Sequence, residues 1–286
     1  MNLEEFAHPR SVEDALALLA AGKGEARPLA GGTSLALAAG VRARVLVDLS
    51  RARLDAITLS GGELHLGAMA SLAAVARSRA VAAAGLTGLV EAAAAAGSSL
   101  LRNQITVGGN LVGLYAWSDL PPMLLALGAT VRLRSATGWR EVTIDEFVAR
   151  HPSKLLLPGE LVVEVVVPRA AEHSGCAFLK FARTAFDYAL CGAAASVRLE
   201  GGVVGAARVA VGALRPLPTR LPAAEKLLVG KQPTAAVLAA AAAAGAAEAE
   251  VAADFRASVE YRRELCGVQV RRVLALAASR AVGRAS

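Results

Sequence analysis

The amino-acid sequence predicts an α+β fold arranged in three lobes. Its 286 residues, 55% of them hydrophobic, are enough for two or three domains with sizeable cores. Apolar strands and helix-like segments are mixed through the first part of the chain. A polar link at residues 169–175 then leads into a run of strands followed by a run of helices. Strands and helices that are segregated in this way are typical of α+β proteins.

The first lobe is predicted to end near Leu54. Ser11 is a favourable N-cap for a helix that carries Ala15, Leu18 and Leu19 on one face. Residues 27–29 and 45–49 are short apolar runs. We expect them to form strands, the first of which leads into a glycine-rich segment.

The second lobe begins with a hairpin signal. Residues 57–59 and 64–68 flank the sequence Ser-Gly-Gly-Glu, which favours a tight turn between two strands. Further along, the pattern predicts helices at residues 71–79, 87–96 and 119–127, and strands at residues 129–134 and 161–167.

The third lobe is expected to be a three-stranded meander covered by helices. The strands fall at residues 177–182, 193–199 and 203–213, with a glycine pair at the last turn. The helices that would cover one face begin at Ala223, Thr234 and Ser258.

The basic charge balance raises the question of a nucleic-acid partner. The net charge is +7, but aromatic residues make up only 4% of the chain and no basic run is interleaved with stacking residues. The densest basic cluster, from Arg262 to Arg272, has helical spacing and is expected to form a solvated face. We therefore expect no nucleic-acid binding, and a basic surface of this kind instead suits an acidic protein partner.

Cysteine and histidine usage excludes several kinds of site. Cys176, Cys191 and Cys266 are widely separated and are expected to be buried free thiols, because they match neither a disulfide framework nor a metal-binding pattern. The four histidines form no metal pattern either, and no serine-histidine-acid arrangement can be assembled. If the protein is redox-active, its redox centre must be an organic cofactor.

No segment predicts membrane insertion or export. The alanine-rich tract at residues 235–247 is too short and too weakly apolar to cross a bilayer. The first five residues are acidic rather than basic, unlike a signal peptide. We therefore expect a cytoplasmic protein without a membrane span.

Two glycine-pair segments are the strongest functional signal. Ala30-Gly31-Gly32-Thr33-Ser34-Leu35 and Thr106-Val107-Gly108-Gly109-Asn110 both combine small residues with hydroxyl or amide groups. Such segments allow backbone N–H groups to approach a polyanion, and together they suggest a clamp around a pyrophosphate in which Gly108 and Gly109 lie against the ligand. The alternative is that both are ordinary turns. A Rossmann fingerprint is missing, because Arg27 stands where the third glycine is required.

These segments, taken with their neighbours, resemble a known family. The Arg102-Asn103 pair, Ser118-Asp119-Leu120 and the Leu157-Pro158-Gly159-Glu160 turn occur in the same order in the FAD-binding subunits of the molybdenum hydroxylases. That group includes the medium subunit of aerobic carbon monoxide dehydrogenase and the flavin domain of xanthine dehydrogenase. The resemblance runs from Phe6 to the C-terminal helices.

The resemblance implies a fold and a set of cofactor contacts. It implies a two-lobed FAD-binding domain of the PCMH type at residues 1–170, with lobes at about 1–54 and 55–170, and a C-terminal α+β domain at residues 175–283. In that family the two glycine loops bind the pyrophosphate and ribityl chain of FAD, an acidic residue contacts the cofactor, and a lysine lies near the flavin. The implied contact residues are Leu29, Ala30, Gly31, Gly32, Thr33, Ser34, Leu35, Thr106, Val107, Gly108, Gly109, Asn110, Ser118, Asp119, Leu157 and Lys180.

The resemblance also implies a role in a complex. A large partner subunit would carry the molybdenum cofactor, a small partner would carry two 2Fe-2S clusters, and FAD would be held here non-covalently. Electrons would pass from the clusters to FAD and on to an external acceptor, in a dimer of heterotrimers. A stand-alone flavin oxidase or reductase and a scaffold subunit that has lost flavin remain as alternatives.

Two features depart from the family pattern. Tyr115 and Trp117 occupy a stretch that is usually small and contains a proline, and Arg183 to Tyr188 replace a segment that is usually rich in arginine and carboxylates. Tyr115 or Trp117 would either stack on the flavin ring or simply pack a loop. Asp119 would either bind the cofactor or cap the helix that follows it.

Overall fold

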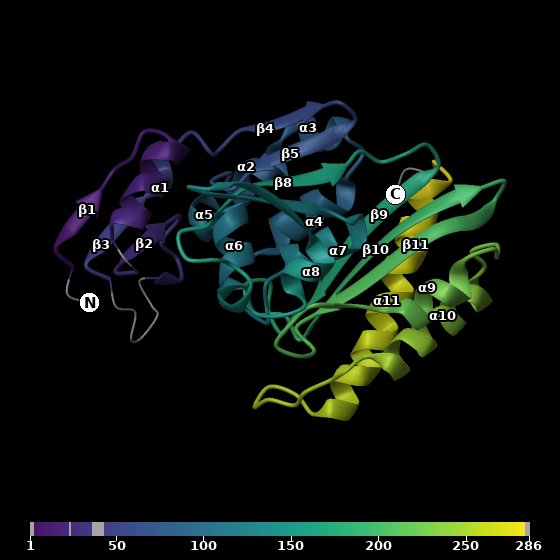
Figure 1. Ribbon diagram of the computed structural model, residues 1–286. Coiled ribbons are helices and arrows are strands. Elements are labelled where there is room, and N and C mark those ends of the chain that lie inside the picture. The colour runs from purple at the N-terminus through teal and green to yellow at the C-terminus, as the bar shows by residue number, and fades with distance from the viewer. Residues whose placement is uncertain (1–2, 23, 36–42, 284–286) are drawn as a thin grey trace.

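The computed structural model describes residues 3–22, 24–35 and 43–283. The first two residues, which entered the signal-peptide argument above, lie outside these ranges. Three sheets follow one another along the molecule (Figure 1), and the α+β class predicted from the sequence is confirmed. None of the helices in the described part of the chain has the length and apolar content needed to span a bilayer.

The first lobe is a small parallel sheet with one helix. Its strand order is β1-β3-β2. The side-chain hydroxyl of Ser11 accepts a hydrogen bond from the Asp14 N–H at 3.0 Å, so the helix begins where its cap predicts. The predicted elements miss β1, which is only three residues long. The elements are β1 (Glu5–Ala7), α1 (Val12–Ala21), β2 (Ala26–Leu29), β3 (Val45–Asp48) and the short helix η2 (Leu49–Arg51).

The second lobe contains a five-stranded antiparallel sheet in the order β4-β5-β8-β6-β7. The central strand β8 is apolar because both of its faces are covered: Val165 and Val167 join the core of the second lobe, whereas Leu161 and Val163 join the core of the first. Strand β7 was not predicted, since it lies at an exposed edge. The strands are β4 (Ile57–Ser60), β5 (Glu63–Gly67), β6 (Thr130–Ser135), β7 (Gly138–Thr143) and β8 (Leu161–Pro168).

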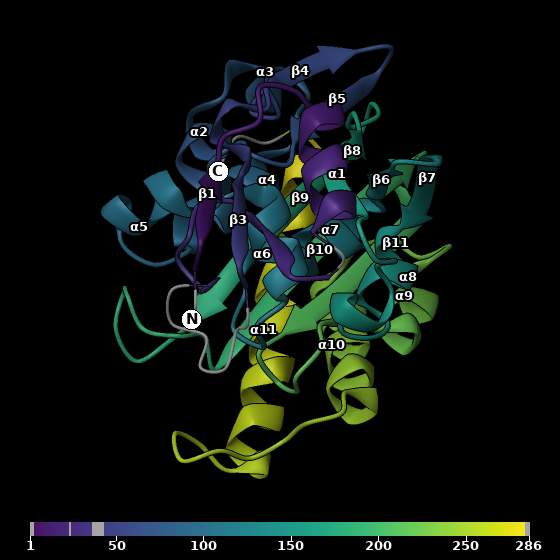
Figure 2. The same ribbon diagram turned by 60° about the vertical axis from the view of Figure 1, so that its left-hand side comes forward.

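Short helices cover this sheet. The single helix predicted at residues 71–79 is two helices, because Ser78 adopts an extended conformation that ends the first and caps the second. Figure 2 shows α5 projecting at the surface. The helices are α2 (Leu72–Arg77), α3 (Arg79–Ala83), α4 (Thr87–Ala95), α5 (Ser99–Gln104), α6 (Val107–Gly113), α7 (Leu120–Leu127), α8 (Ile144–Val148) and η3 (Pro152–Lys154).

The C-terminal unit is an antiparallel sheet packed between two layers of helices. It has four strands rather than the predicted three, because two residues after the meander add the short strand β12. Cys176 and Phe178 of β9 face the core of the second lobe, whereas Ala177 faces α11. The elements are β9 (Ser174–Phe181), β10 (Cys191–Glu200), β11 (Val203–Gly212), β12 (Thr219–Arg220), α9 (Pro222–Leu228), α10 (Ala235–Glu248) and α11 (Val259–Ala281).

The prediction of a fully solvated arginine face on α11 is wrong for Arg262. Its side chain is only 2% exposed and lies 2.6 Å from the carboxylate of Asp254. It also donates to the carbonyl oxygens of Leu190 and Ala213, at 3.3 and 2.5 Å. Arg262 therefore holds loops together inside the molecule. The three cysteines, by contrast, are buried free thiols as predicted.

Candidate functional site

The first glycine segment connects β2 to the second lobe. An added Cβ on Gly31 would lie 1.6 Å from the carbonyl oxygen of Gln104, so only glycine allows this close approach. Gly32 has a φ of 71°, a left-handed conformation that also favours glycine. No residue in the described ranges accepts a hydrogen bond from the backbone N–H groups of Gly31, Gly32 or Thr33. The segment is therefore held against the second segment while it presents N–H donors.

The second glycine segment is not an open loop but the start of helix α6. Thr106 caps the helix, accepting a hydrogen bond from the Gly109 N–H at 3.1 Å. The N–H groups of Val107 and Gly108 donate to Ala70 and Ala68, at 2.9 and 2.8 Å. An added Cβ on Gly108 would lie 2.8 Å from the Ala68 Cβ. Packing inside the protein thus explains this glycine, and its contact with a cofactor stays a prediction.

Asn110 carries an unsatisfied polar atom. Its side-chain Nδ2 donates to the hydroxyl of Ser118 at 3.5 Å, but its Oδ1 is buried and has no hydrogen-bond partner among the described residues. A buried acceptor without a donor costs about 1–3 kcal/mol. The arrangement is therefore suited to a ligand that brings an O–H or N–H group to this atom.

Asp119 and Lys180 form a buried ion pair between the second lobe and the C-terminal sheet. The Lys180 ammonium lies 3.1 Å from the Asp119 carboxylate and also donates to the Ala95 carbonyl at 3.1 Å. Burial raises the pKa of Asp119 to about 6, although Lys180 opposes this shift. Asp119 precedes α7, but its side chain makes no capping hydrogen bond, so the capping alternative is wrong.

The remaining predicted residues lie in different settings. Leu29 ends β2, and its Cδ1 would be 3.7 Å from a Cβ on Gly32. Leu157 is 59% exposed, and its N–H donates to the Glu160 carboxylate, which itself pairs with Arg140. This ion pair stabilises the turn before β8.

Models of known protein families cover both parts of the chain. Residues 2–170 match the FAD binding domain in molybdopterin dehydrogenase, and residues 176–277 match the CO dehydrogenase flavoprotein C-terminal domain. The chain belongs to the family of FAD-binding subunits of molybdenum-containing dehydrogenases. It is an oxidoreductase subunit, and the resemblance found in the sequence is confirmed.

Relatives and solved structures match this flavin subunit over nearly its whole length. Subunit alpha of the 6-hydroxypseudooxynicotine dehydrogenase complex of Paenarthrobacter nicotinovorans is 37% identical, with 95% of this chain and 93% of that relative covered. The structure of carbon monoxide dehydrogenase from Hydrogenophaga pseudoflava has a TM-score of 0.91 at 33% identity, covering 97% and 98%. Quinoline 2-oxidoreductase from Pseudomonas putida 86 has a TM-score of 0.90 at 32% identity, covering 97% of each chain.

The residues of this flavin subunit fit FAD. The N–H donors of the first segment suit the pyrophosphate, and the orphan Asn110 Oδ1 suits a hydroxyl or ring N–H of the cofactor. Asp119 and Lys180 place paired charges in the same region of the fold. When bound, FAD supplies the redox chemistry that the side chains lack, while the chain supplies binding and orientation.

Sequence reasoning missed one aromatic residue near this site. Tyr115 and Trp117 stack with ring centroids 5.1 Å apart and planes 10° apart, and Trp117 also packs on Tyr188 at 4.4 Å. Tyr188 belongs to the C-terminal unit and is 71 positions away in the sequence from Trp117. No local pattern signals a contact over that separation. The only hint was the unusual composition of residues 183–188.

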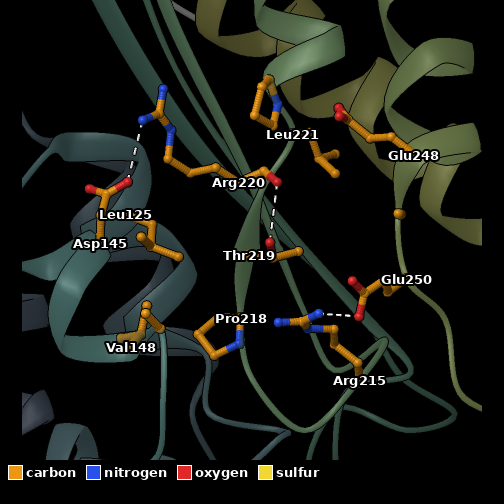
Figure 3. A pocket seen from close by; sticks show the side chains of 13 residues that line it. Leu125, Asp145, Val148, Arg215, Pro218, Thr219, Arg220, Leu221, Glu248 and Glu250 are labelled. Carbon is orange, nitrogen blue, oxygen red and sulfur yellow. Dashed lines mark hydrogen bonds and ion pairs between the residues drawn. The ribbon is translucent and has the colours of Figure 1, made fainter. Parts of the chain in front are cut away.

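A cavity lies elsewhere in the flavin subunit. It has a volume of about 480 Å³ and opens between α8 and the segment around β12 (Figure 3). Most of its charged side chains are in ion pairs: Asp145 pairs with Arg220 and with Arg208, which lies outside the cavity lining, and Arg215 pairs with Glu250. Glu248 instead accepts a hydrogen bond from the Ala223 N–H. Because these charges already have partners, the cavity is best explained as a place where ion pairs connect the second lobe to the C-terminal unit.

Proposed function

We propose that this chain is the FAD-binding electron-transfer subunit of a molybdenum hydroxylase complex. Within the proposal, it takes electrons from 2Fe-2S clusters on a partner subunit and passes them to an external acceptor. The observation that carries the proposal is the convergence of Gly31–Thr33 N–H donors, the orphan Asn110 Oδ1 and the buried Asp119–Lys180 pair in a chain of this family.

Each part of the site has a distinct task in this proposal. The first glycine segment binds the pyrophosphate through its backbone N–H groups, as oriented amides do in other anion sites. Asn110 accepts a hydrogen bond from the ribityl chain or ring, and Ser118 fixes its orientation. Asp119 and Lys180 orient the ring and adjust its potential through their charges. Leu29, Ser34, Leu35, Val107 and Leu157 are assigned apolar or supporting contacts.

The proposal places this chain between two partners. A small subunit carries the 2Fe-2S clusters and a large subunit carries the molybdenum cofactor, in a dimer of heterotrimers. Support comes from the relative described as a subunit of a dehydrogenase complex, and from the net charge of +7, which suits an acidic partner surface. A cytoplasmic location stays a prediction of the sequence.

FAD is held non-covalently in this proposal, because neither a histidine nor a cysteine lies in or next to the glycine segments. The purified chain should bind about one FAD per polypeptide, and acid precipitation should release all of the yellow colour into the supernatant. Flavin that remained with the pellet would contradict the non-covalent assignment, and a colourless chain that takes up no added FAD would contradict flavin binding itself.

The subunit role has a separate test. The isolated chain should hold FAD that a chemical reductant can reduce, yet show no substrate-dependent dye reduction until the iron–sulfur and molybdenum subunits are co-expressed with it. Substrate-dependent dye reduction by the isolated, metal-free chain would instead identify a stand-alone flavoenzyme.

A further inference from the structure

A second cavity lies where the C-terminal sheet meets the end of helix α7. It has a volume of about 360 Å³ and is lined by strands β9 to β11, by Ala126 and Leu127 of α7, and by the linker at residues 168–171. Pockets that hold small organic molecules usually have volumes of about 300–1,000 Å³. The second cavity is therefore large enough for such a ligand.

The face of the sheet that lines this cavity changes from apolar to polar along the strands. Ala194 of β10 lies in the core of the second lobe, and Ser196 and Arg198 follow it on the same face, because alternate residues of a strand point the same way. Ser196 lies opposite Arg208 of β11, and Arg198 lies opposite Ser174 of β9. Four polar side chains from three strands thus come together on the cavity wall.

The charged groups that line the second cavity are all positive. Arg169 of the linker adds a third guanidinium to those of Arg198 and Arg208, and no carboxylate is among the lining residues in the described part of the chain. Arg198 pairs with Glu200 at 2.7 Å and Arg208 pairs with Asp145 at 2.6 Å, and both of these carboxylates lie outside the lining. The Arg169 guanidinium has no partner among the described residues, where only the backbone N–H of Arg169 is hydrogen-bonded. An unpaired guanidinium in such a setting attracts an anion.

The chemistry of the lining limits the kind of anion. A guanidinium binds a carboxylate through two parallel hydrogen bonds, and the hydroxyls of Ser174 and Ser196, which have no described hydrogen-bond partner, can donate to the same oxygen atoms. Leu86 and Leu127 contribute apolar surface from the second lobe. Burying an apolar group against that surface is favourable. The cavity thus suits a ligand that combines a carboxylate with an apolar body.

The second cavity is separate from the groups assigned to FAD. Asp119 directly precedes α7, whereas the cavity is lined by the other end of this helix, which is about 12 Å long. Along β9, Ser174 and Lys180 are separated by about 20 Å of strand. A ligand in the second cavity would therefore leave the proposed flavin site free.

We propose that the second cavity binds a small organic anion, a carboxylate carried on an apolar ring or chain. Arg169 supplies the unpaired guanidinium, and Ser174 and Ser196 supply the hydroxyl donors. Because Arg169 lies in the linker and the two serines lie in the sheet, the bound carboxylate connects the linker to the C-terminal unit. This inference goes beyond the proposed function, since none of these groups is assigned to FAD.

A pair of probes that differ only in charge tests the inference. 2-Naphthoate carries a carboxylate on a planar apolar body, and 2-naphthamide is an uncharged molecule of nearly the same shape. Both are titrated by calorimetry into the full chain at saturating FAD, so that any flavin site is already filled.

Three variants locate the bound probe. Arg169→Gln removes the unpaired charge, whereas Ser196→Leu fills the cavity and keeps all three arginines. Arg271→Gln is the matched control, because Arg271 is an exposed residue of α11, which packs against the opposite face of the sheet. Circular dichroism and flavin content check that each variant is folded. Arg169 is exposed, so the test stands on Arg169→Gln if Ser196→Leu does not fold.

We expect the parent chain to bind one naphthoate with a Kd below about 1 mM, and naphthamide at least about tenfold more weakly. Arg169→Gln should weaken naphthoate binding about fivefold, the upper range for an exposed ion pair, and Ser196→Leu should abolish it. Arg271→Gln should match the parent. The inference would be overturned by a parent chain that binds no naphthoate or binds both probes equally. Parent affinity in Arg169→Gln or in folded Ser196→Leu, or an equal loss in Arg169→Gln and Arg271→Gln, would overturn it as well.

Discussion

The first glycine segment offers the backbone N–H groups of Gly31, Gly32 and Thr33 to no acceptor within the described residues, whereas the second segment has its N–H groups bonded inside the protein. Gly108 and Gly109 begin a capped helix, and the N–H of Asn110 continues it by donating to Thr106. Two segments with nearly the same sequence signature thus offer a ligand different groups.

A glycine pair can therefore be required for more than one physical reason. Gly31 is required because an added Cβ would lie 1.6 Å from the Gln104 carbonyl oxygen, and Gly108 is required by contact with Ala68. Neither contact involves a ligand. In the proposed function, the cofactor would therefore meet backbone donors at the first segment and side chains, chiefly Asn110, at the second.

Gly31→Ala should have the largest effect. The added Cβ would collide with the backbone of Gln104, which cannot move as a flexible side chain does, so the first segment must separate from α5. We expect a loss of more than about 3 kcal/mol in unfolding free energy, above the usual range for overpacked sites, together with loss of FAD retention. Chemical denaturation and flavin content measure the two effects.

Gly267→Ala is the matched control for that substitution. Its Cβ would lie 3.5 Å from Ala246, an ordinary contact, and Gly267 lies within helix α11, where alanine is favoured by about 1 kcal/mol. The control should be at least as stable as the parent and retain FAD. Equal behaviour of the two alanine variants would show that the close contact between Gly31 and Gln104 is unimportant.

Asp119→Asn should remove part of the pH dependence of the unfolding free energy. Burial raises the pKa of Asp119 to about 6. The folded state therefore holds this proton more tightly than the unfolded state, and the stability contributed at low pH is lost as pH rises from about 4 through 6. The shift from an ordinary aspartate pKa near 3.9 corresponds to a loss of roughly 3 kcal/mol of unfolding free energy between low and neutral pH.

Urea unfolding of the FAD-free parent and Asp119→Asn chains from pH 4 to pH 7 measures this effect. The parent should lose stability relative to the variant as pH rises. A difference in unfolding free energy between the two chains that stays constant with pH would mean that Asp119 does not titrate in this range. Lys180 would then offset the effect of burial on the Asp119 pKa.

Thr106→Ala tests the helix start at the second segment. Loss of the side-chain acceptor for the Gly109 N–H should cost about 1 kcal/mol of unfolding free energy. Thr33→Ala at the first segment should cost much less, because Thr33 caps no described helix. A cost at Thr33 that equals the cost at Thr106 would remove the distinction between the segments.

Asn110→Ala should separate binding from stability. FAD binding should weaken about fivefold, which corresponds to roughly 1 kcal/mol for one hydrogen bond. The FAD-free chain should lose little stability, since the substitution removes a buried Oδ1 that has no described partner. Calorimetric titration with FAD and urea unfolding give the two numbers. A large loss of stability with unchanged FAD affinity would assign Asn110 a structural role only.

Local signals made much of the fold predictable. The helix after Ser11 and the strands that flank residues 201 and 202 follow from a cap and a glycine turn, which act between near neighbours. Helix α6 was missed because glycine disfavours helices, and its stability comes from the Thr106 cap and from contact with Ala68.

The site was predictable only where a local motif exists. Asp119 and Lys180 were found separately, but their ion pair joins residues far apart in the sequence. The same holds for Tyr188 beside Trp117. It also holds for Arg262, whose helical spacing indicated exposure although its side chain is buried and paired with Asp254. Long-range pairs of this kind depend on tertiary packing, which composition and periodicity do not encode.

Amide hydrogen exchange with and without FAD distinguishes the two glycine segments. The amides of Gly31, Gly32 and Thr33 should exchange rapidly in the FAD-free chain and become protected when FAD binds. The amides from Val107 to Asn110 should be protected in both states, because they are already hydrogen-bonded within the protein. Unchanged exchange at residues 31–33 in a chain that holds FAD would contradict the account.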